Sequence, residues 1–351
     1  MYEGDLATGS RGAVTQLRVG VLAYPGCFGS QVYSIPDLLT IAAHVAPAAE
    51  SPRIVVMSPR RHVTAAGGLR VAVSPLREVD VLVVPGFETG PAPAFASVLS
   101  QLKPEIAAIQ DLRTQGTRVV SICVGAFLLA EAGLLAGRDA TTSWLYAHDL
   151  AQAYPDINVI AERTVVVESG VITAAAFSAM NDLALVLVRE HHGAQVARRT
   201  ARFTLLDDTR TAQTPYSDPA LLPRNGGRLS NTVTRYLDQN LDQRYDLNSL
   251  AGIVGVSPRT LLRRFTSETQ QTPLEYLQRA RIRRAKMLLE ETDRSVARIS
   301  HSVGYRDAAT FAKLFRRHTG CTPGAYRTAF NREGLSAVHR AGPGPVRAVR
   351  E

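Results

Sequence analysis

The sequence predicts two domains: an open α/β sheet, then an all-helical unit that contains one two-helix motif twice. Two observations lead to this prediction. Short β-branched runs alternate with helical stretches in the N-terminal part, and a set of residues recurs at an offset of 50 in the C-terminal part. The chain of 351 residues is long enough for two domains that each bury their own core.

Four strands are expected in the first domain. Each is an apolar, β-branched run without polar alternation, which is typical of strands buried in a parallel sheet. A helix is expected over Pro104–Gln115. Together they indicate an open α/β sheet in three layers, with helices on both faces of the sheet. The strands are expected over Arg18–Tyr24, Arg53–Met57, Val79–Val84 and Arg118–Ile122.

Charge is divided unevenly along the chain. The formal net charge is +9, yet residues 1–227 hold 18 Lys and Arg against 20 Asp and Glu, whereas residues 228–330 hold 18 against 9. A basic domain next to a near-neutral one is typical of proteins that bind a polyanion. Nucleic acid is therefore the first expected partner.

Cysteine content and hydropathy narrow the class of protein. Cys27, Cys123 and Cys321 are too few for a disulfide framework or a zinc ribbon, so we expect a reducing compartment, no metal and no cofactor. The N-terminus lacks the basic and apolar pattern of an export signal. No apolar run approaches the ~18 residues that cross a bilayer. We expect a cytoplasmic protein with no membrane partner.

The helical part repeats the spacing of a helix-turn-helix. In each copy a small residue, Ala251 or Ser300, is followed four residues later by a glycine, Gly255 or Gly304, and then by a second helix. One long helix over Leu274–Glu291 connects the copies. The second helices are expected over Ser257–Phe265 and Asp307–Arg317, with Ser257 and Asp307 as N-caps and Pro258 at the first helical position.

The second helices are amphipathic and basic. Leu261 and Phe265, like Phe311 and Phe315, recur at i and i+4 and should face the core, which leaves the basic side chains outside. Such charge can simply solvate a helix, but two copies in a domain of net charge +9 favour DNA binding. Two helices about 34 Å apart can enter successive major grooves.

Cys123 is expected at a sharp strand-to-helix turn, because it directly follows a strand and precedes Gly125 and a helical stretch. The helix N-terminus would favour the thiolate. The alternative is a small buried residue. Catalysis also needs a general base, and the histidines, His148 and the pair His191-His192, are placed on other helices. Enzyme chemistry is therefore not expected.

The segment Ser121–Trp144, with Cys123-Val124-Gly125-Ala126 and Ala140-Thr141-Thr142, resembles the ThiJ/PfpI-type, class I glutamine amidotransferase-like domain fused to AraC/XylS-type regulators. Related enzymes have a histidine directly after the cysteine, where this chain has Val124, and Gln31 stands where an aspartate is expected. The resemblance therefore implies a catalytically inactive sensor domain that binds a small metabolite.

The C-terminal part, with Val303-Gly304-Tyr305 and Thr322-Pro323-Gly324-Ala325-Tyr326-Arg327, closely resembles the AraC/XylS DNA-binding domain, with motifs at about 247–266 and 295–317. By position in that family, six residues approach base edges: Arg259, Leu262, Arg263, Ala308, Ala309 and Lys313. Thr310 is expected at the DNA as well. Five more are expected at phosphate or sugar: Thr260, Arg264, Arg306, Arg316 and Arg317.

A ligand pocket is expected beyond the carboxyl ends of the strands. Two other functions stay open. Cys123 could serve as a thiol-based redox or electrophile sensor, with Cys27 resolving it, or the chain could be an active cysteine-dependent amidohydrolase or glyoxalase-type enzyme with a DNA-binding appendage. The expected pocket residues are Tyr24, Cys27, Phe87, Glu88, Cys123, Val124, Ser143 and Trp144.

The resemblances imply a transcription regulator that binds double-stranded promoter DNA, a small-molecule effector and a second copy of itself. The sequence leaves open whether it is an activator, with a contact to RNA polymerase, or a repressor. The expected organisation is an N-terminal arm (1–17), a sensor domain (18–204), a linker (205–227), a double helix-turn-helix domain (228–328) and a basic tail (329–351).

Overall fold

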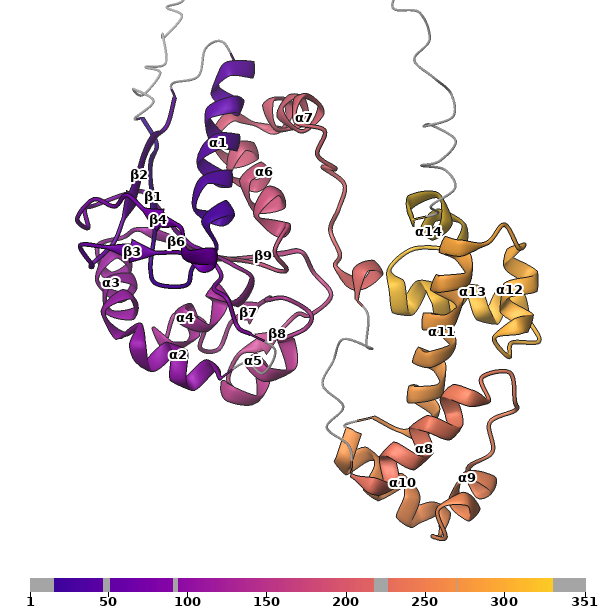
Figure 1. Cartoon of the computed structure of the whole chain (residues 1–351). Coiled ribbons are helices and arrows are strands. Elements are labelled where there is room, and N and C mark those ends of the chain that lie inside the picture. The colour runs from indigo at the N-terminus through magenta and orange to yellow at the C-terminus, as the bar shows by residue number, and fades with distance from the viewer. Residues whose placement is uncertain (1–15, 47–50, 91–93, 218–226, 270, 331–351) are drawn as a thin grey trace, which may run out of the picture. The chain divides into compact units, whose positions relative to one another are not determined.

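The structure is a computed structural model of the chain, and it describes residues 16–46, 51–90, 94–217, 227–269 and 271–330 (Figure 1). The chain divides into two compact units, residues 1–213 and 214–351, and each is described by itself. Most of the expected arm, most of the expected tail and residues 218–226 of the expected linker lie outside the described residues. Among the described helices, none is long and apolar enough to cross a membrane.

The first unit is built on a six-stranded sheet in the order β2-β1-β5-β6-β10-β9. Its first five strands are parallel, and their buried, β-branched residues explain why the sequence predicted four of them. Two short two-stranded sheets, β3-β4 and β7-β8, lie outside it. The strands are Arg18–Leu22 (β1), Arg53–Met57 (β2), Val63–Thr64 (β3), Arg70–Val71 (β4), Val81–Val84 (β5), Arg118–Ile122 (β6), Asp139–Ala140 (β7), Asn158–Val159 (β8), Val165–Glu168 (β9) and Val171–Ala174 (β10).

The sheet differs from a purely parallel one at its edge. β9 pairs antiparallel with β10, with Val171 opposite Glu168. Only Ser169 and Gly170 connect the two strands, and Gly170 adopts a positive φ of 75°. A connection this short can only form a hairpin, since a parallel crossover needs a dozen or more residues.

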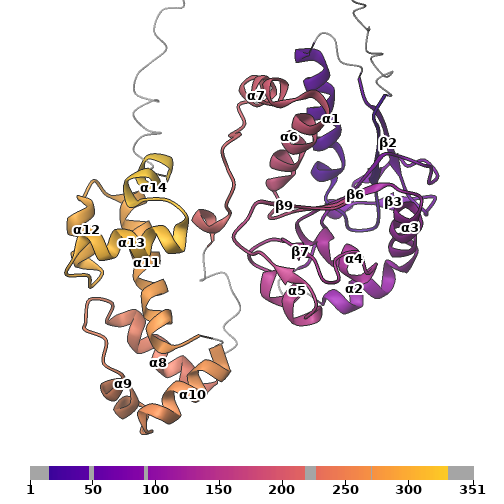
Figure 2. The same ribbon diagram turned by 180° about the vertical axis from the view of Figure 1, so that it is seen from behind.

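Helices cover both faces of this sheet, as the three-layer prediction requires. In Figures 1 and 2, α1, α6 and α7 lie on one face, and α2, α3 and α4 lie on the other. The expected helix over Pro104–Gln115 is α3. The helices are Gly29–Val45 (α1), Phe95–Gln101 (α2), Lys103–Thr114 (α3), Ala126–Glu131 (α4), Ala147–Ala153 (α5), Ala179–His192 (α6) and Ala194–Phe203 (α7), with 3-10 turns at Ala66–Gly68 (η1) and Cys123–Gly125 (η2).

In its described residues, the second unit is helical, and it contains the predicted motif twice. α9 and α10 form the first helix-turn-helix, α12 and α13 form the second, and the long helix α11 runs between them (Figure 1). The elements are Thr214–Tyr216 (η3), Arg228–Gln239 (α8), Leu247–Ile253 (α9), Pro258–Thr269 (α10), Pro273–Glu291 (α11), Val296–Ser302 (α12), Ala308–Thr319 (α13) and Pro323–Phe330 (α14).

Each helix-turn-helix has its own hydrophobic core. Leu261 and Phe265 of α10 pack with α8, α9 and the start of α11, around Val233 and Leu277. The second cluster, which includes Phe311 and Phe315 of α13 together with residues of α14, packs on the other end of α11. All four of these α10 and α13 side chains are fully buried. The i, i+4 prediction is confirmed in both copies.

The predicted N-caps begin the second helices. Asp307 accepts hydrogen bonds from the backbone N–H groups of Ala309 and Thr310, at 3.1 and 2.8 Å. Ser257 accepts one from the N–H of Thr260 at 3.2 Å. Such caps satisfy backbone donors that have no partner inside the helix. They determine where the two basic helices start.

Candidate DNA interface and ligand site

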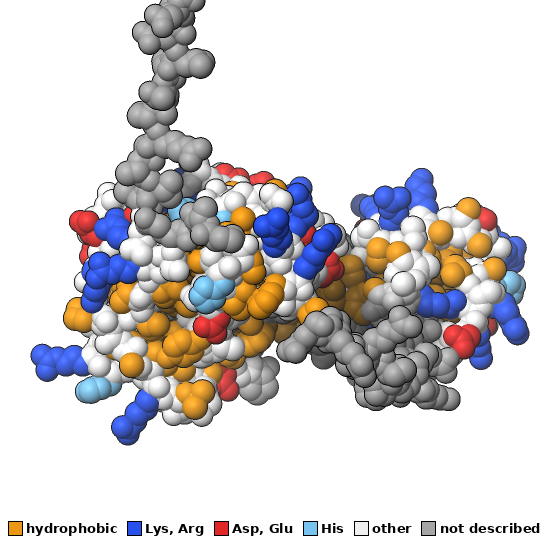
Figure 3. Space-filling view, turned by 90° about the horizontal axis from the view of Figure 1, so that it is seen from above, with side chains coloured by type: hydrophobic (Ala, Val, Ile, Leu, Met, Phe, Trp, Pro, Cys, Tyr) orange, Lys and Arg blue, Asp and Glu red, His pale blue; other side chains and the backbone are white. Residues whose placement is uncertain are grey.

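The basic side chains of α10 and α13 point away from the two cores. Arg259, Arg263 and Lys313 are exposed and form no ion pair within the described part of the chain. Figure 3 shows Lys and Arg side chains gathered on the helical unit, with few acidic ones on the face seen there. Unpaired cations on two equivalent helices suit contacts to a nucleic acid.

Most other expected DNA residues are also exposed. Leu262, with 39% of its surface exposed, lies on the open side of α10. Arg264 forms an ion pair with Glu268 at 3.6 Å. The exposed residues of the second motif are Arg306, Ala308, Ala309, Thr310, Arg316 and Arg317.

Two threonines at equivalent positions of α10 and α13 form side-chain hydrogen bonds with the N-cap residues of their helices. The hydroxyl of Thr310 donates to the Asp307 carboxylate at 2.6 Å, and that of Thr260 lies 2.9 Å from the hydroxyl of Ser257. Each threonine therefore fastens the first turn of its helix, a role that the sequence prediction did not include.

Arg281 on α11 holds the two motifs together and was not predicted from the sequence, where it reads as one more surface arginine. Only 8% of it is exposed. Its Nε donates to the carbonyl of Leu241 and its Nη2 to the carbonyl of Gln243, both at 2.7 Å, and both carbonyls lie between α8 and α9. Its guanidinium also lies over the ring of Tyr305, in the turn of the second motif, 5.2 Å from the ring centroid.

Cys123 forms the predicted sharp turn. It follows β6 with a φ of +55°, a conformation that L residues rarely adopt. Gly125 fits next to it because a Cβ there would lie 2.6 Å from the carbonyl oxygen of Pro85. The turn and the close backbone approach are confirmed.

Of the two alternatives for Cys123, a thiolate or a small buried residue, the surroundings of the side chain favour the second. The residue is buried, with 8% of its surface exposed, and this burial raises the pKa of its thiol to about 11. Burial also raises the pKa of Cys27, which has no exposed surface. Desolvation disfavours the charged thiolate, and α4, which follows the turn, has only six residues. Burial therefore favours the neutral form of both thiols.

Gln31 lies beside the cysteine turn. It is fully buried, and its Oε1 accepts a hydrogen bond of 2.7 Å from the N–H of Gly86. A Cβ placed on Gly86 would meet both Cys123 Cβ, at 3.1 Å, and Gln31 Oε1, at 3.3 Å. The side chain that bonds Gly86, next to this turn, is thus a carboxamide, which has no acidic proton to exchange at neutral pH.

Several of the expected pocket residues lie at the carboxyl edge of the sheet. Tyr24 donates a buried hydrogen bond to the carbonyl of Pro85, and Cys27 and Phe87 form an antiparallel bridge. Glu88 is exposed and Trp144 half-buried. The others are buried: Cys123, Val124 and Ser143. Two aromatic rings that were not predicted, Phe28 and Phe177, pack edge to face at 5.3 Å, and the carbonyl of Phe177 accepts from Gln31 Nε2 at 3.4 Å.

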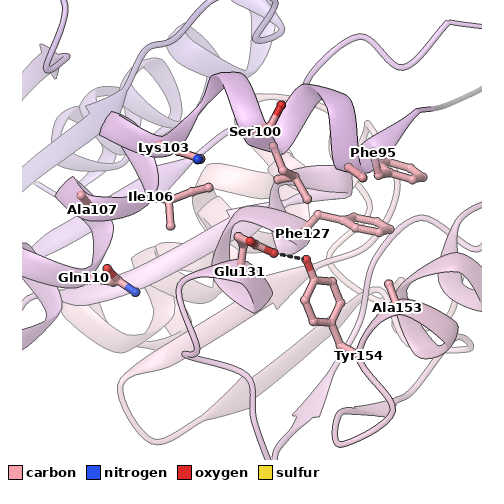
Figure 4. Close-up of a pocket in the computed structure, with 12 residues that line it drawn as sticks. Phe95, Ser100, Lys103, Ile106, Ala107, Gln110, Phe127, Glu131, Ala153 and Tyr154 are labelled. Atoms are coloured by element: carbon pink, nitrogen blue, oxygen red, sulfur yellow. Dashed lines mark hydrogen bonds between the residues drawn. The ribbon is translucent and has the colours of Figure 1, made fainter.

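A cavity of about 370 Å³ lies elsewhere in the first unit, among α2, α3, α4 and α5 (Figure 4). Tyr154 donates to Glu131 at 2.6 Å on one side of it, and Phe95 stacks on Phe127 at 4.0 Å. None of the eight expected ligand residues lines it. Its lining is Phe95, Ala96, Leu99, Ser100, Lys103, Ile106, Ala107, Gln110, Phe127, Glu131, Ala153 and Tyr154.

Among the described residues there is no cluster of three or more His, Cys, Asp and Glu side chains that could hold a metal ion. His148 lies exposed on α5, and His191 and His192 end α6, as the sequence indicated.

A doubly repeated helix-turn-helix joined to a flavodoxin-like unit with a cysteine turn defines a class, the DNA-binding transcription regulators with an α/β sensor-type domain. Residues 250–329 match the family model of a helix-turn-helix domain, and residues 39–190 match the DJ-1/PfpI family. The chain thus combines an AraC-type helix-turn-helix domain with a DJ-1/PfpI domain, and it is a DNA-binding transcription regulator.

Relatives with this arrangement are similar over most of their length. The HTH-type transcriptional regulator GbdR of Pseudomonas aeruginosa is 27% identical over 69% of this chain and 68% of its own. CdhR of the same organism is 28% identical over 82% and 85%. GlxA of Rhizobium meliloti is 29% identical over 62% and 68%. All three are named as HTH-type transcriptional regulators.

Proposed function

We propose that this regulator responds to a small metabolite bound at the carboxyl edge of the sheet, next to Cys123. The observation that carries the proposal is that the neighbouring parallel strands β1, β5 and β6 end at one edge of the sheet, where Cys123 follows β6 and Gln31 binds the N–H of Gly86 after β5. Ligands of open α/β sheets bind at this edge. Buried amides and aromatic rings, with no ionised thiol, favour reversible binding over chemistry.

The proposal treats the first unit as a binding domain without catalysis. A cysteine nucleophile needs a base that takes its proton. Here the thiol of Cys123 has a raised pKa, its neighbour Gln31 is an amide, and Val124 replaces the adjacent histidine of related enzymes. A hydrolase or lyase assay in which turnover disappears in Cys123→Ala would contradict this part of the proposal.

In the second unit, α10 and α13 are proposed to enter the major groove. Arginine can bond guanine O6 and N7 at once, whereas alanine offers only apolar contact, so the first motif should be more selective than the second. The proposed base contacts are Arg259, Leu262, Arg263, Ala308, Ala309 and Lys313. The proposed backbone contacts are Thr260, Arg264, Arg306, Arg316 and Arg317, with Thr310 beside them.

A homodimer completes the proposal, since two linked DNA-binding units raise each other's effective concentration on DNA. If the regulator is an activator, we propose that it also contacts RNA polymerase while it is bound at the promoter. Sedimentation of the full chain at micromolar concentration tests the dimer. A monomer both with and without DNA would contradict it.

The ligand is tested by thermal shifts of the full chain against a metabolite panel, in wild type and Cys123→Ala. A shift that survives Cys123→Ala supports reversible binding and identifies the effector class. A shift that needs the thiol would favour covalent or redox sensing instead. If no compound shifts the melting temperature, the effector does not belong to the classes in the panel, and this would contradict the proposal for those classes.

A further inference from the structure

Gln213 anchors the segment through which the chain leaves the first unit. It is the last residue of that unit, and only 3% of it is exposed. Its backbone N–H donates to the carbonyl of Glu162 at 2.8 Å, and neighbouring Ala212 bridges antiparallel to Arg163. Farther back, Arg210 binds the Asp182 carboxylate at 2.6 Å. Residues expected to form a free linker are therefore held on the first unit.

The side chain of Gln213 binds the backbone on both sides of Ser143. Its Nε2 donates to the carbonyl of Thr142 at 2.9 Å and to that of Ala161 at 2.7 Å. Its Oε1 accepts from the N–H of Trp144 at 3.0 Å. Only a carboxamide supplies a donor and an acceptor at these two positions. The hydrogen bonds of Gln213 therefore depend on where the backbone of Ser143 and Trp144 lies, and both of these residues are expected to contact the ligand.

Thr142 extends this connection to the cysteine turn. Its hydroxyl donates to the carbonyl of Cys123 at 2.8 Å, and Thr142 has no exposed surface. Buried hydrogen bonds of this kind are costly to leave unmade. Two side-chain hydrogen bonds, through Thr142 and then through Gln213, thus join the backbone of Cys123 to the end of the first unit.

The chain enters the second unit directly after Gln213. Thr214 is its first residue. Within that unit the ring of Tyr216 packs edge to face on Phe330 at 5.2 Å, and the carbonyl of Ser217 accepts from Lys286 Nζ at 2.8 Å. Lys286 is on α11, the helix between the two motifs. Only Thr214 and Pro215 separate Gln213, the anchor on the first unit, from Tyr216, the first anchor on the second.

From these contacts we propose that Gln213 is the positioning residue that couples occupancy at the cysteine turn to DNA binding. An occupant beside Cys123 displaces Thr142 and Trp144, the carboxamide of Gln213 loses its matched partners, and the segment into the second unit is released. This rests on the ligand site of the proposed function. Coupling between two sites is reciprocal. A substitution at Gln213 must therefore also change the accessibility of Cys123.

The first test uses iodoacetamide as a small probe of the turn, on the full chain carrying Cys321→Ser. Alkylation of Cys123 and of fully buried Cys27 is followed by peptide mass spectrometry. We expect Gln213→Ala to speed alkylation of Cys123 at least fivefold relative to Cys27, and Gln152→Ala, at an exposed glutamine of α5, to change neither. Equal acceleration at both thiols, or none at Cys123, would overturn the proposal.

The second test measures DNA affinity before and after alkylation of Cys123, with a duplex selected from random sequence by the full chain. In the Cys321→Ser protein we expect the added carboxamidomethyl group to change the Kd at least threefold. The change should vanish in Gln213→Ala and in Thr142→Val, which keeps the shape but loses the hydroxyl. An equal change in all three proteins would refute the coupling. A metabolite panel without hits would remove the proposed effector yet leave both tests intact, because their probe is iodoacetamide.

Discussion

Arg281 lies over the ring of Tyr305, in the turn of the second motif, while it donates to two carbonyls of the loop that leads from α8 into the first motif. It therefore links the second motif to the segment that precedes the first. α11 alone would separate the motifs by a fixed length. The buried guanidinium also restrains how they rotate about that helix. If both basic helices enter successive grooves as proposed, Arg281 would affect DNA binding through their relative placement.

Arg281→Leu is expected to lower both stability and DNA affinity. The carbonyls of Leu241 and Gln243 would be left without their donor, at a cost of about 1–3 kcal/mol for each buried acceptor. Thermal and denaturant unfolding of the full chain measure this loss. Arg279→Leu, at an exposed position on the same helix, is the control, and a similar loss there would contradict the special role of Arg281.

Gly304→Ala is expected to cost more stability than Gly255→Ala, although the two glycines occupy the same place in the two turns. Both have a positive φ, 86° and 65°, which costs an alanine roughly 1–2 kcal/mol. At Gly304 the new Cβ would in addition lie 2.5 Å from the carbonyl oxygen of Leu241, whereas at Gly255 nothing lies within 4 Å. Urea unfolding of both variants tests the order, and equal losses would refute it.

The raised pKa of Cys123 predicts a loss of stability at high pH. In the folded chain the pKa is about 11, above the ordinary value of 9.0 for a cysteine. Between these values the unfolded chain releases a proton that the folded chain keeps, so the free energy of unfolding falls as the pH rises from 9 to 11. We expect a steeper fall in wild type than in Cys123→Ala. Parallel pH profiles from thermal denaturation would argue against it.

Arg263→Ala and Arg316→Ala are expected to affect DNA binding differently. Loss of a bidentate guanine contact should cost about 1–3 kcal/mol at one base pair and relax the preference there. Loss of a phosphate contact should weaken all sequences alike and lower the salt dependence by about one counterion. Binding isotherms on matched and mismatched duplexes at several salt concentrations distinguish them. The same loss pattern in both variants would show that the assignment is incorrect.

The sequence predicted the elements well because their signals are local. β-branched runs placed the parallel strands, capping residues placed the starts of α10 and α13, and the repeat at an offset of 50 identified both motifs. The antiparallel edge was missed, since the hairpin of β9 and β10 lies in a segment to which no strand was assigned. The cavity bordered by Phe95 and Tyr154 was missed because its lining comes from four helices.

What the sequence by itself determined was the class of this protein: local periodicity, the divided charge and the cysteine turn indicated a DNA-binding regulator with an α/β domain. What only the tertiary structure decided was the state of particular side chains. Arg281 reads as a surface charge and is buried, Cys123 reads as either a thiolate or a buried thiol and is buried with a raised pKa, and Gln213 reads as linker and is an anchor. In each case the deciding quantity is desolvation by residues distant in sequence, which no local pattern contains.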